Sequence, residues 1–248
     1  MYTTSFSLTV AESKKLIARG ILKYQPVVNA IKKHSLLIGS GTTNSYIAAE
    51  IIGKDFKKQN FVTGRTLPQK SDKNRIFKYT EKPLKISNRK IERLDDLTKA
   101  YNDLKAGDVV LKGANAISGD GTKAGVLIGH NTGGGMGAML GIVMARKVKL
   151  IHPVGIEKTI PADLEQISRL SRENSFSQGP SLFVSPGEVF NECHAVTAIF
   201  PGIKAWPYSA GGVAGAEGSV RILVEGEKSD IDKLIKFIDT IFGEPLFI

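Results

Sequence analysis

The stretch LLIGSGTTNSYIAAEIIG, residues 36–53, places two glycines and three hydroxyl side chains between an apolar run and a helical pattern. His34–Ile38 predicts a strand, and Ser45–Ile52 predicts a helix that Gly53 ends. A helix N-terminus presents unpaired backbone N–H groups and a partial positive charge, and glycines let a ligand approach the backbone. We therefore expect residues 39–44 to bind an anion.

The chemistry of this loop favours a phosphate. The loop reads G-x-G-x-x-N, without the Gly-Lys-Ser/Thr of a Walker A motif and without the last glycine of the dinucleotide fingerprint. That fingerprint also needs an acid about 20 residues on, where this chain has Gly64 and Arg65. The alternative is a tight turn that binds nothing. We assign phosphate contacts to Gly39, Ser40, Gly41, Thr42, Thr43 and Asn44.

A second glycine-rich loop, residues 129–137, again lies between an expected strand, Gly125–Ile128, and an expected helix, Met136–Ala145. Five of its nine residues are glycine, which packing alone does not readily explain. Such turns gather at the carboxyl edge of a parallel sheet, where ligands bind. We expect the two loops to converge on one pocket. Further ligand contacts are assigned to Asn115, Asn131, Thr132, Gly133, Gly134 and Gly135.

Strands and helices alternate along most of the chain, which predicts parallel strands joined by crossover helices. We expect an α/β fold with a Rossmann-like, mostly parallel sheet and flanking helices over residues 1–200. Two strands and a helix near the end, at 203–208, 219–225 and 231–242, predict a small C-terminal α+β subdomain over residues 201–248.

Local signals place several further elements. Thr9 and Glu12 have the spacing of a capping box at the start of a helix, which Pro26 should interrupt. Ser185-Pro186-Gly187-Glu188 has the form of a helix start, and the helix should end at Pro201. Short strands are expected at Asn60–Thr63, Arg75–Tyr79 and Leu84–Ser87.

Composition limits the classes of function. Cys193 is the only cysteine, so an intrachain disulfide is excluded and a reducing, cytoplasmic setting is favoured. Neither a signal peptide nor a stretch of 18 apolar residues is present, so no membrane partner is expected. The net charge is +10, and residues 65–93 hold ten basic against three acidic residues. A nucleic-acid surface needs more stacking aromatics than Phe77 and Tyr79 provide, so a solvated basic segment is the preferred interpretation.

The opening helix and LLIGSGTTNSYIAAEI resemble the superfamily that joins ribose-5-phosphate isomerase, glucosamine-6-phosphate deaminase and the CoA transferases. In that superfamily a G-x-G-S/T-T/S loop after the first strand holds a phosphate. DVVLKGANAI (108–117) resembles the isomerase strand that leads into D-G-A-D-E, and LIGHNTGGGMGAM (127–139) is similar to its K-G-G-G-G-A loop. The resemblance covers roughly residues 10–152 and implies a phosphorylated small-molecule ligand and a homo-oligomer.

The departures from that pattern concern catalysis. Lys112 and Asn115 stand where the isomerases place two aspartates, and sugar isomerisation needs a carboxylate base. The candidate catalytic residues are therefore Lys112, His130 and Glu157, with Glu157 the candidate nucleophile of a transferase. Glu157 and Lys158 follow a predicted strand. One interpretation is that both face the same pocket, and the alternative is that they cap the following helix or form a surface ion pair.

The four histidines lack metal-ligand spacing, so neither a metal nor another cofactor is predicted. Three functions remain open at this point. They are an isomerase- or transferase-like enzyme, a non-catalytic sensor of the same fold, and nucleic-acid binding through residues 65–93.

Overall fold

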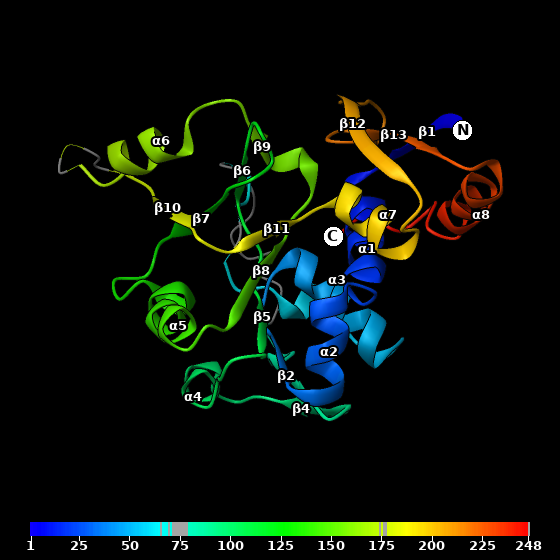
Figure 1. Ribbon diagram of the computed structural model, residues 1–248. Coiled ribbons are helices and arrows are strands. Elements are labelled where there is room, and N and C mark those ends of the chain that lie inside the picture. Colours follow the sequence, from blue (N-terminus) through cyan, green and yellow to red (C-terminus); the bar gives the residue numbers. More distant parts are fainter. Residues whose placement is uncertain (65, 69, 71–78, 174, 176–177, 248) are drawn as a thin grey trace.

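The computed structural model describes residues 1–64, 66–68, 70, 79–173, 175 and 178–247. This part of the chain forms a mixed α/β fold with three sheets (Figure 1). The strand expected at Arg75–Tyr79 falls almost wholly outside the described residues. Within the described part, no helix combines the length and the apolar character needed to cross a membrane.

The helices keep the chain order that the sequence patterns suggest. The first break confirms the expected effect of Pro26, because one helix ends at Ile21 and the next begins at Gln25, beside that proline. The helices are α1 Val10–Ile21, α2 Gln25–Lys33, α3 Thr42–Ile52, α4 Leu97–Asn102, α5 Gly134–Ala145, α6 Leu164–Leu170, α7 Glu192–Ile199 and α8 Lys228–Asp239, with the 3₁₀ turns η1 Lys58–Phe61 and η2 Ile156–Lys158.

The largest sheet has the strand order β11-β8-β5-β2-β3-β4. The first four strands in this order are parallel neighbours, and β3 and β4 extend the sheet with antiparallel pairs. The strand expected at Leu84–Ser87 is confirmed as β3. The other bounds are β11 Glu188–Phe190, β8 Lys149–Pro153, β5 Val109–Leu111, β2 Ser35–Ile38 and β4 Lys90–Arg93.

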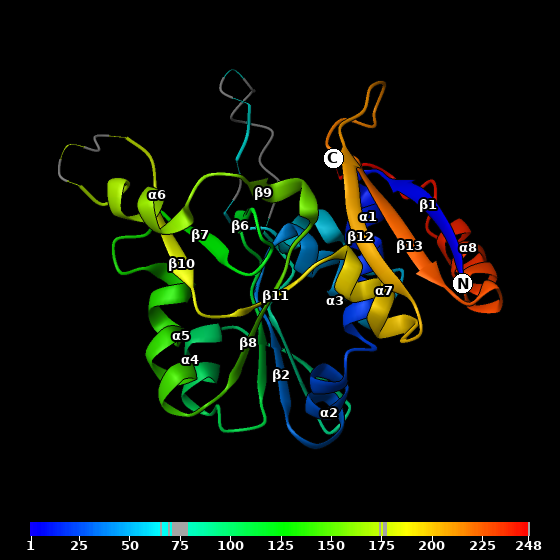
Figure 2. The same cartoon turned by 45° about the horizontal axis from the view of Figure 1, so that its top comes forward.

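The sheet is covered on both faces, as Figure 2 shows, with α4 and α5 on one side and α1, α2 and α3 on the other. Successive strand residues point to opposite faces. Leu37 and Val110 accordingly pack in one apolar cluster with Met139 of α5. Their neighbours Leu36 and Leu111 pack in the other cluster with the helices of the opposite face.

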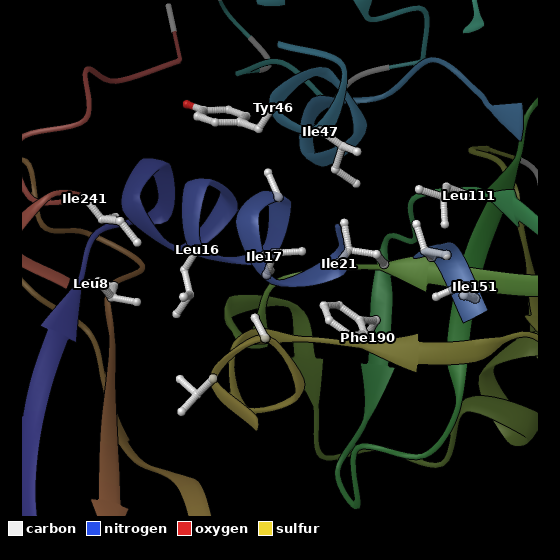
Figure 3. Close-up of a cluster of buried hydrophobic side chains, with 14 of the residues drawn as sticks. Leu8, Leu16, Ile17, Ile21, Tyr46, Ile47, Leu111, Ile151, Phe190 and Ile241 are labelled. Carbon is white, nitrogen blue, oxygen red and sulfur yellow. The ribbon is translucent and has the colours of Figure 1, made fainter. Parts of the chain in front are cut away.

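Helix α1 is the centre of the second cluster. Leu16, Ile17 and Ile21 are fully buried, and Figure 3 shows them between α3 and the segment around Phe190. The expected capping box is confirmed: the Thr9 N–H donates to Glu12 Oε2 at 2.8 Å, and the Glu12 N–H donates to Thr9 Oγ1 at 3.3 Å. The cap fixes where α1 begins, and the apolar spacing fixes which face it buries.

A second sheet, with the order β10-β7-β6-β9, was not expected beside the mostly parallel sheet predicted from the sequence. The strand expected at Gly125–Ile128 forms, but as part of β7 (Ala124–Ile128), antiparallel to both β6 (Ala116–Ser118) and β10 (Ser181–Ser185). The reason is the turn between β6 and β7. There Asp120 accepts from the Thr122 N–H at 3.0 Å and Gly121 has a φ of +74°, so a hairpin replaces the crossover helix. The remaining strand is β9 Thr159–Ile160.

A third sheet joins the two ends of the chain. The expected strands near the C-terminus are confirmed as β12 (Lys204–Ala210) and β13 (Val220–Gly226), and α8 follows them. The N-terminal strand β1 (Tyr2–Leu8) was not expected from the sequence, and it pairs antiparallel with β13 along its whole length. This small α+β unit therefore includes residues from outside the expected range 201–248.

The expected helix from Ser185 to Pro201 is wrong in its first half. Ser185 ends strand β10, residues 188–190 form β11, and Asn191 caps the shorter helix α7. The Ser185 hydroxyl is used elsewhere, because it lies 2.7 Å from His152 Nε2 and accepts from the Gly187 N–H at 3.2 Å. The strand expected at Asn60–Thr63 is also wrong, because the chain turns there as η1.

Candidate functional site

A pocket of about 340 Å³ lies where β2 and β5 end, at the N-terminus of α3. The pocket collects loops from both larger sheets, which places it at the carboxyl edge of the parallel strands, the usual ligand position in such sheets. Its described lining consists of residues 40–43, Thr63, Gly64, Thr66, residues 112–115, Val126, Leu127, Gly129, Lys158 and Pro180.

The first wall of the pocket is the turn from β2 into α3. The Gly39 N–H donates to the Leu111 carbonyl at 3.2 Å, and the Gly41 N–H donates to the Phe61 carbonyl at 3.0 Å. Gly41 has φ +157° and ψ +159°, a conformation that is essentially restricted to glycine. The α3 N-terminus has no side-chain cap, and the N–H groups of its first turn have no acceptor within the helix. These donors border the pocket through Thr42 and Thr43.

Asn44 and Gly39 support this turn from behind and do not line the pocket. Asn44 is fully buried, and its Nδ2 donates to the carbonyls of Gly39 at 2.8 Å and Leu111 at 3.0 Å. The Asn44 side chain thus ties the start of α3 to the ends of both strands. Of the six residues assigned to the phosphate, Ser40, Gly41, Thr42 and Thr43 line the pocket.

Two lysines bring positive charge to the opposite wall. Lys112 follows β5, and Lys158 ends η2. Lys158 Nζ donates to the Ala114 carbonyl at 2.8 Å. Burial lowers the pKa of both side chains, but the carboxylates of Glu157 and Glu192 oppose that shift only at Lys158. Within the described part of the chain, Lys112 has neither a hydrogen-bond nor an ion-pair partner for its Nζ.

The second glycine-rich loop contributes less than expected. Asn115 lines the pocket, as does Gly129 at the start of the loop, whereas His130 and residues 131–135 do not line it. His130 is exposed, and its Nδ1 accepts from the Thr132 N–H at 3.3 Å.

The glycines of this loop have a packing role. Gly133 adopts a left-handed φ of +80° before α5, and a Cβ at Gly137 would lie 2.3 Å from the Thr132 carbonyl oxygen. Two of the five glycines therefore serve the start of α5. The loop does approach the site from behind, since a Cβ at Gly135 would lie 4.0 Å from Lys112 Cε.

One interpretation of the sequence places Glu157 and Lys158 at the same pocket, but the structure separates them. Glu157 borders a different groove, between the β6–β7 hairpin and β12, whose volume is about 680 Å³. Its Oε1 lies 4.0 Å from Lys14 Nζ, and its buried Oε2 has no hydrogen-bond partner among the described residues. We refer to Lys14, Glu157, Lys158 and Glu192 as the buried charge cluster.

Glu192, the first residue of α7, is the most buried member of this cluster. Its carboxylate accepts from the Ile156 N–H at 3.0 Å, which holds η2 against α7. Burial raises the pKa of Glu192 to about 7, and the neighbouring Glu157 carboxylate adds to that rise. His152 lies on β8 of the largest sheet. Burial lowers its pKa to about 4, because it disfavours the charged imidazolium.

These two groups predict opposing pH dependences of stability. The pKa of Glu192 is raised from 4.5, so this carboxyl stabilises the fold at low pH, and that stabilisation is lost as the pH rises towards about 7. The pKa of His152 is lowered from 6.5, so its contribution is present above that pH and is lost as the pH falls towards about 4. We expect Glu192→Gln to remove the first effect, so that stability between about pH 4.5 and 6.5 rises with pH more steeply than in the wild type. Urea unfolding at several pH values measures this, and parallel profiles for the two proteins would contradict it.

Some residues that line the pocket were not predicted from the sequence, among them Thr63, Thr66, Val126, Leu127 and Pro180. Thr63 and Thr66 flank Gly64 and Arg65, the two residues that favour a phosphate over a dinucleotide in the sequence. Their hydroxyls could therefore have been assigned to the site from the sequence. Val126, Leu127 and Pro180 reach the pocket through the second sheet, whose pairing the sequence did not reveal.

The described residues hold no group of three or more His, Cys, Asp or Glu side chains placed to bind a metal ion. Comparison of the chain with protein-family models, with curated proteins and with solved structures found no match. The resemblance to the sugar-phosphate isomerase, deaminase and CoA-transferase superfamily therefore stays a prediction that rests on the motifs alone.

Proposed function

We propose that this protein binds a phosphorylated small molecule in the pocket at the N-terminus of α3. The observation that carries the proposal is the meeting of three donor types around one cavity. These are the N–H groups of the first turn of α3, the hydroxyls of Ser40, Thr42, Thr43 and Thr63, and the cationic side chain of Lys158. Helix N-termini and lysines both favour a phosphate dianion, and hydroxyls supply further hydrogen bonds.

The size of the pocket points to the class of ligand. A volume of about 340 Å³ is near the lower end of the range for small-molecule sites. A monophosphorylated sugar or a similar compound fits such a volume better than a whole CoA or dinucleotide. The Rossmann-like description and the superfamily assignment belong to this proposal, and the four parallel strands β2, β5, β8 and β11 support them.

The described lining of the pocket contains no aspartate or glutamate. Sugar isomerisation needs a base to move a proton between carbons, and a carboxylate is the base that the resemblance implies. The proposal is therefore limited to ligand recognition. Glu157 borders the other groove, so its assignment as a nucleophile gains no support from this pocket.

The test is a thermal-melt comparison of matched ligands: ribose 5-phosphate against ribose, and AMP against adenosine, with inorganic phosphate, CoA and a short DNA duplex added. A ligand at 100 times its dissociation constant stabilises the fold by about 2.7 kcal/mol. We expect ribose 5-phosphate or another sugar monophosphate to raise the melting temperature and its unphosphorylated partner to leave it unchanged. Equal shifts from ribose and ribose 5-phosphate, or a salt-sensitive shift with DNA alone, would contradict the proposal.

A further inference from the structure

Lys112 differs from Lys158 in how its charge is compensated. Lys158 is hydrogen-bonded to a carbonyl and lies near two carboxylates of the buried charge cluster, which favour its ammonium form. The described residues offer Lys112 no such partner, although the residue is half-buried and borders the same pocket. Because burial disfavours the charged form of an amine, the pKa of Lys112 is lowered, and its free amine is more accessible than that of an exposed lysine.

The surroundings of Lys112 add to this effect. Its backbone follows Leu111, which accepts hydrogen bonds from Gly39 and Asn44 beside the N-terminus of α3. Its Cε reaches the first turn of α5, where a Cβ on Gly135 would lie 4.0 Å away. Helix N-termini carry partial positive charge and disfavour a neighbouring cation. The first turn of α5 thus lies beside a lysine that has no carboxylate partner among the described residues.

We propose that Lys112 is an amine nucleophile that forms an imine with the aldehyde or ketone carbon of a phosphorylated ligand. This inference rests on the proposed function, because the phosphate bound at α3 holds the carbonyl group against Lys112. Desolvation is one of the conditions that activate a lysine amine towards carbonyl compounds. Lys158 lines the same pocket and, with α3, supplies the charge that binds the phosphate.

The step is balanced without any further reagent. The lone pair of Lys112 Nζ attacks the carbonyl carbon, and the carbonyl oxygen takes up a proton to give a carbinolamine. Loss of that hydroxyl with the second amine proton, as one water molecule, leaves the carbon–nitrogen double bond. Tyr101 borders the same turn of α5 as Lys112, since its Oη would lie 3.9 Å from the same Cβ position on Gly135. Burial raises its pKa, so this phenol stays protonated and can donate a hydrogen bond.

The test traps the imine by reduction. The full-length protein is incubated with glyceraldehyde 3-phosphate and sodium cyanoborohydride, whose hydride converts the imine to a stable secondary amine, and the modified lysine is located by peptide mass spectrometry. We expect at least about 10-fold more modification at Lys112 than at the exposed Lys99 of α4, which corresponds to about 1.4 kcal/mol in activation free energy. Inorganic phosphate should suppress the reaction, and unphosphorylated glyceraldehyde should not give the same selectivity.

Two variants test whether Lys112 acts as a nucleophile or only contributes a positive charge to phosphate binding. Lys112→Arg keeps a positive charge but cannot form an imine, so we expect trapping at this position to disappear while the melting shift with inorganic phosphate remains. Lys99→Arg is the matched control and should leave trapping unchanged. Modification spread evenly over surface lysines, or total trapping in Lys112→Arg equal to that of the wild type, would overturn the imine.

The melting data distinguish the two proposals. A stabilising shift with glyceraldehyde 3-phosphate in the absence of trapping at Lys112 would leave the phosphate pocket standing and exclude the covalent step. Absence of both the shift and the trapping would overturn the phosphate pocket as well.

Discussion

Replacement of Thr42 by glutamate is expected to weaken the binding of a phosphorylated ligand about 100-fold, or roughly 2.7 kcal/mol. Thr42 is the first residue of α3 and borders the pocket. The new carboxylate would lie among the donors that hold the phosphate, and two like charges a few ångströms apart repel by this amount at a partly exposed site. Isothermal titration with ribose 5-phosphate, or with whichever ligand shifts the melt most, measures the loss.

A glutamate at position 42 is expected to leave the fold intact. Glutamate in the first turn of a helix is favourable by about 0.3–1 kcal/mol, so a loss of binding cannot be ascribed to a weakened α3. Gly41 would be a poorer target, because its backbone conformation strains any other residue. Thr42→Gln adds the same bulk without charge and is the matched control. If Thr42→Gln and Thr42→Glu bind the ligand equally, the phosphate does not lie at this helix end.

Lys14→Met is expected to lower the free energy of unfolding by about 3 kcal/mol or more. Lys14 lies on α1 with a side chain that is only 8% exposed, 4.0 Å from Glu157 and facing Glu192 in the buried charge cluster. Without this cation, the Glu157 carboxylate keeps only Lys158 as a neighbouring cation among the described residues, and Glu192, whose pKa is raised to about 7, is held more strongly in its protonated form. Uncompensated buried charge is among the costliest defects in a fold. Urea denaturation at neutral pH measures the change.

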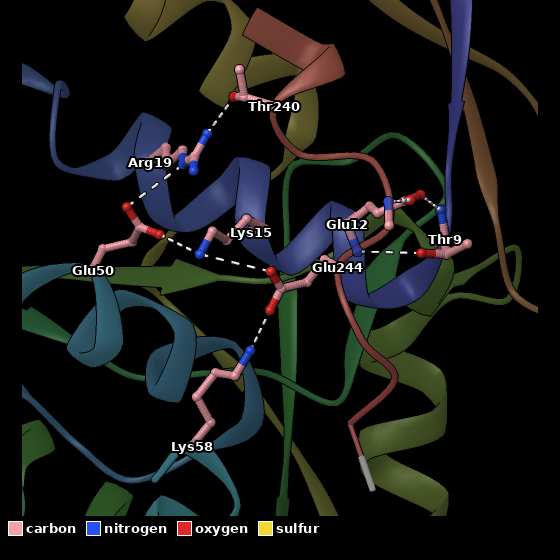
Figure 4. A network of polar contacts seen from close by, with 9 residues as sticks. Thr9, Glu12, Lys15, Arg19, Glu50, Lys58, Thr240 and Glu244 are labelled. Carbon is pink, nitrogen blue, oxygen red and sulfur yellow. Dashed lines mark hydrogen bonds and ion pairs between the residues drawn. The ribbon is translucent and has the colours of Figure 1, made fainter. Parts of the chain in front are cut away.

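The neighbouring lysine on the same helix provides the control. Lys15 lies 2.7 Å from Glu50 and 3.7 Å from Glu244 in a partly exposed network that Figure 4 shows around α1. Partly exposed ion pairs contribute about 1 kcal/mol or less, so Lys15→Met should cost clearly less than Lys14→Met. Equal losses for the two variants, or a neutral Lys14→Met, would show that Lys14 does not compensate the buried carboxylates.

Elements whose signals are local could be predicted from the sequence. The Thr9–Glu12 capping box and the β2–α3 turn each depend on residues within a few positions of one another. The same holds for the two C-terminal strands, which are separated by a short glycine-rich loop. In such cases the residues that make the interaction are adjacent in the chain, and the pattern is visible without tertiary information.

Elements that depend on distant partners could not be predicted in this way. Ser185 to Glu188 fits a helix start, but parallel pairing of Glu188 with Ile151 and the contact between Ser185 and His152 turn this segment into strands. Likewise, the glycines near α5 indicated a ligand loop, whereas Gly137 packs against the Thr132 carbonyl. Tertiary contacts override local propensity in both places.

The candidate site also contains features that could be predicted from the sequence and features that could not. The helix end at Ser40–Thr43 and the position of Lys112 could be read from strand and helix order, because both follow strands of one sheet. The sequence does not indicate that Glu157 and Lys158 line different cavities. Adjacent side chains on η2 point into different cavities, and only the packing of α1 and α7 determines which one faces the phosphate pocket.

The pairing of β1 with β13 has a consequence for how the chain folds during synthesis. Residues 2–8 are synthesised long before their partners at 220–226. At about 5–20 residues per second the first strand waits roughly 10 to 40 s for its neighbour. During that time the apolar side chains of Phe6 and Leu8 lack the sheet that buries them. The β2–α3 turn can form early, but the sheet that contains β1 forms only after residues 220–226 have been made.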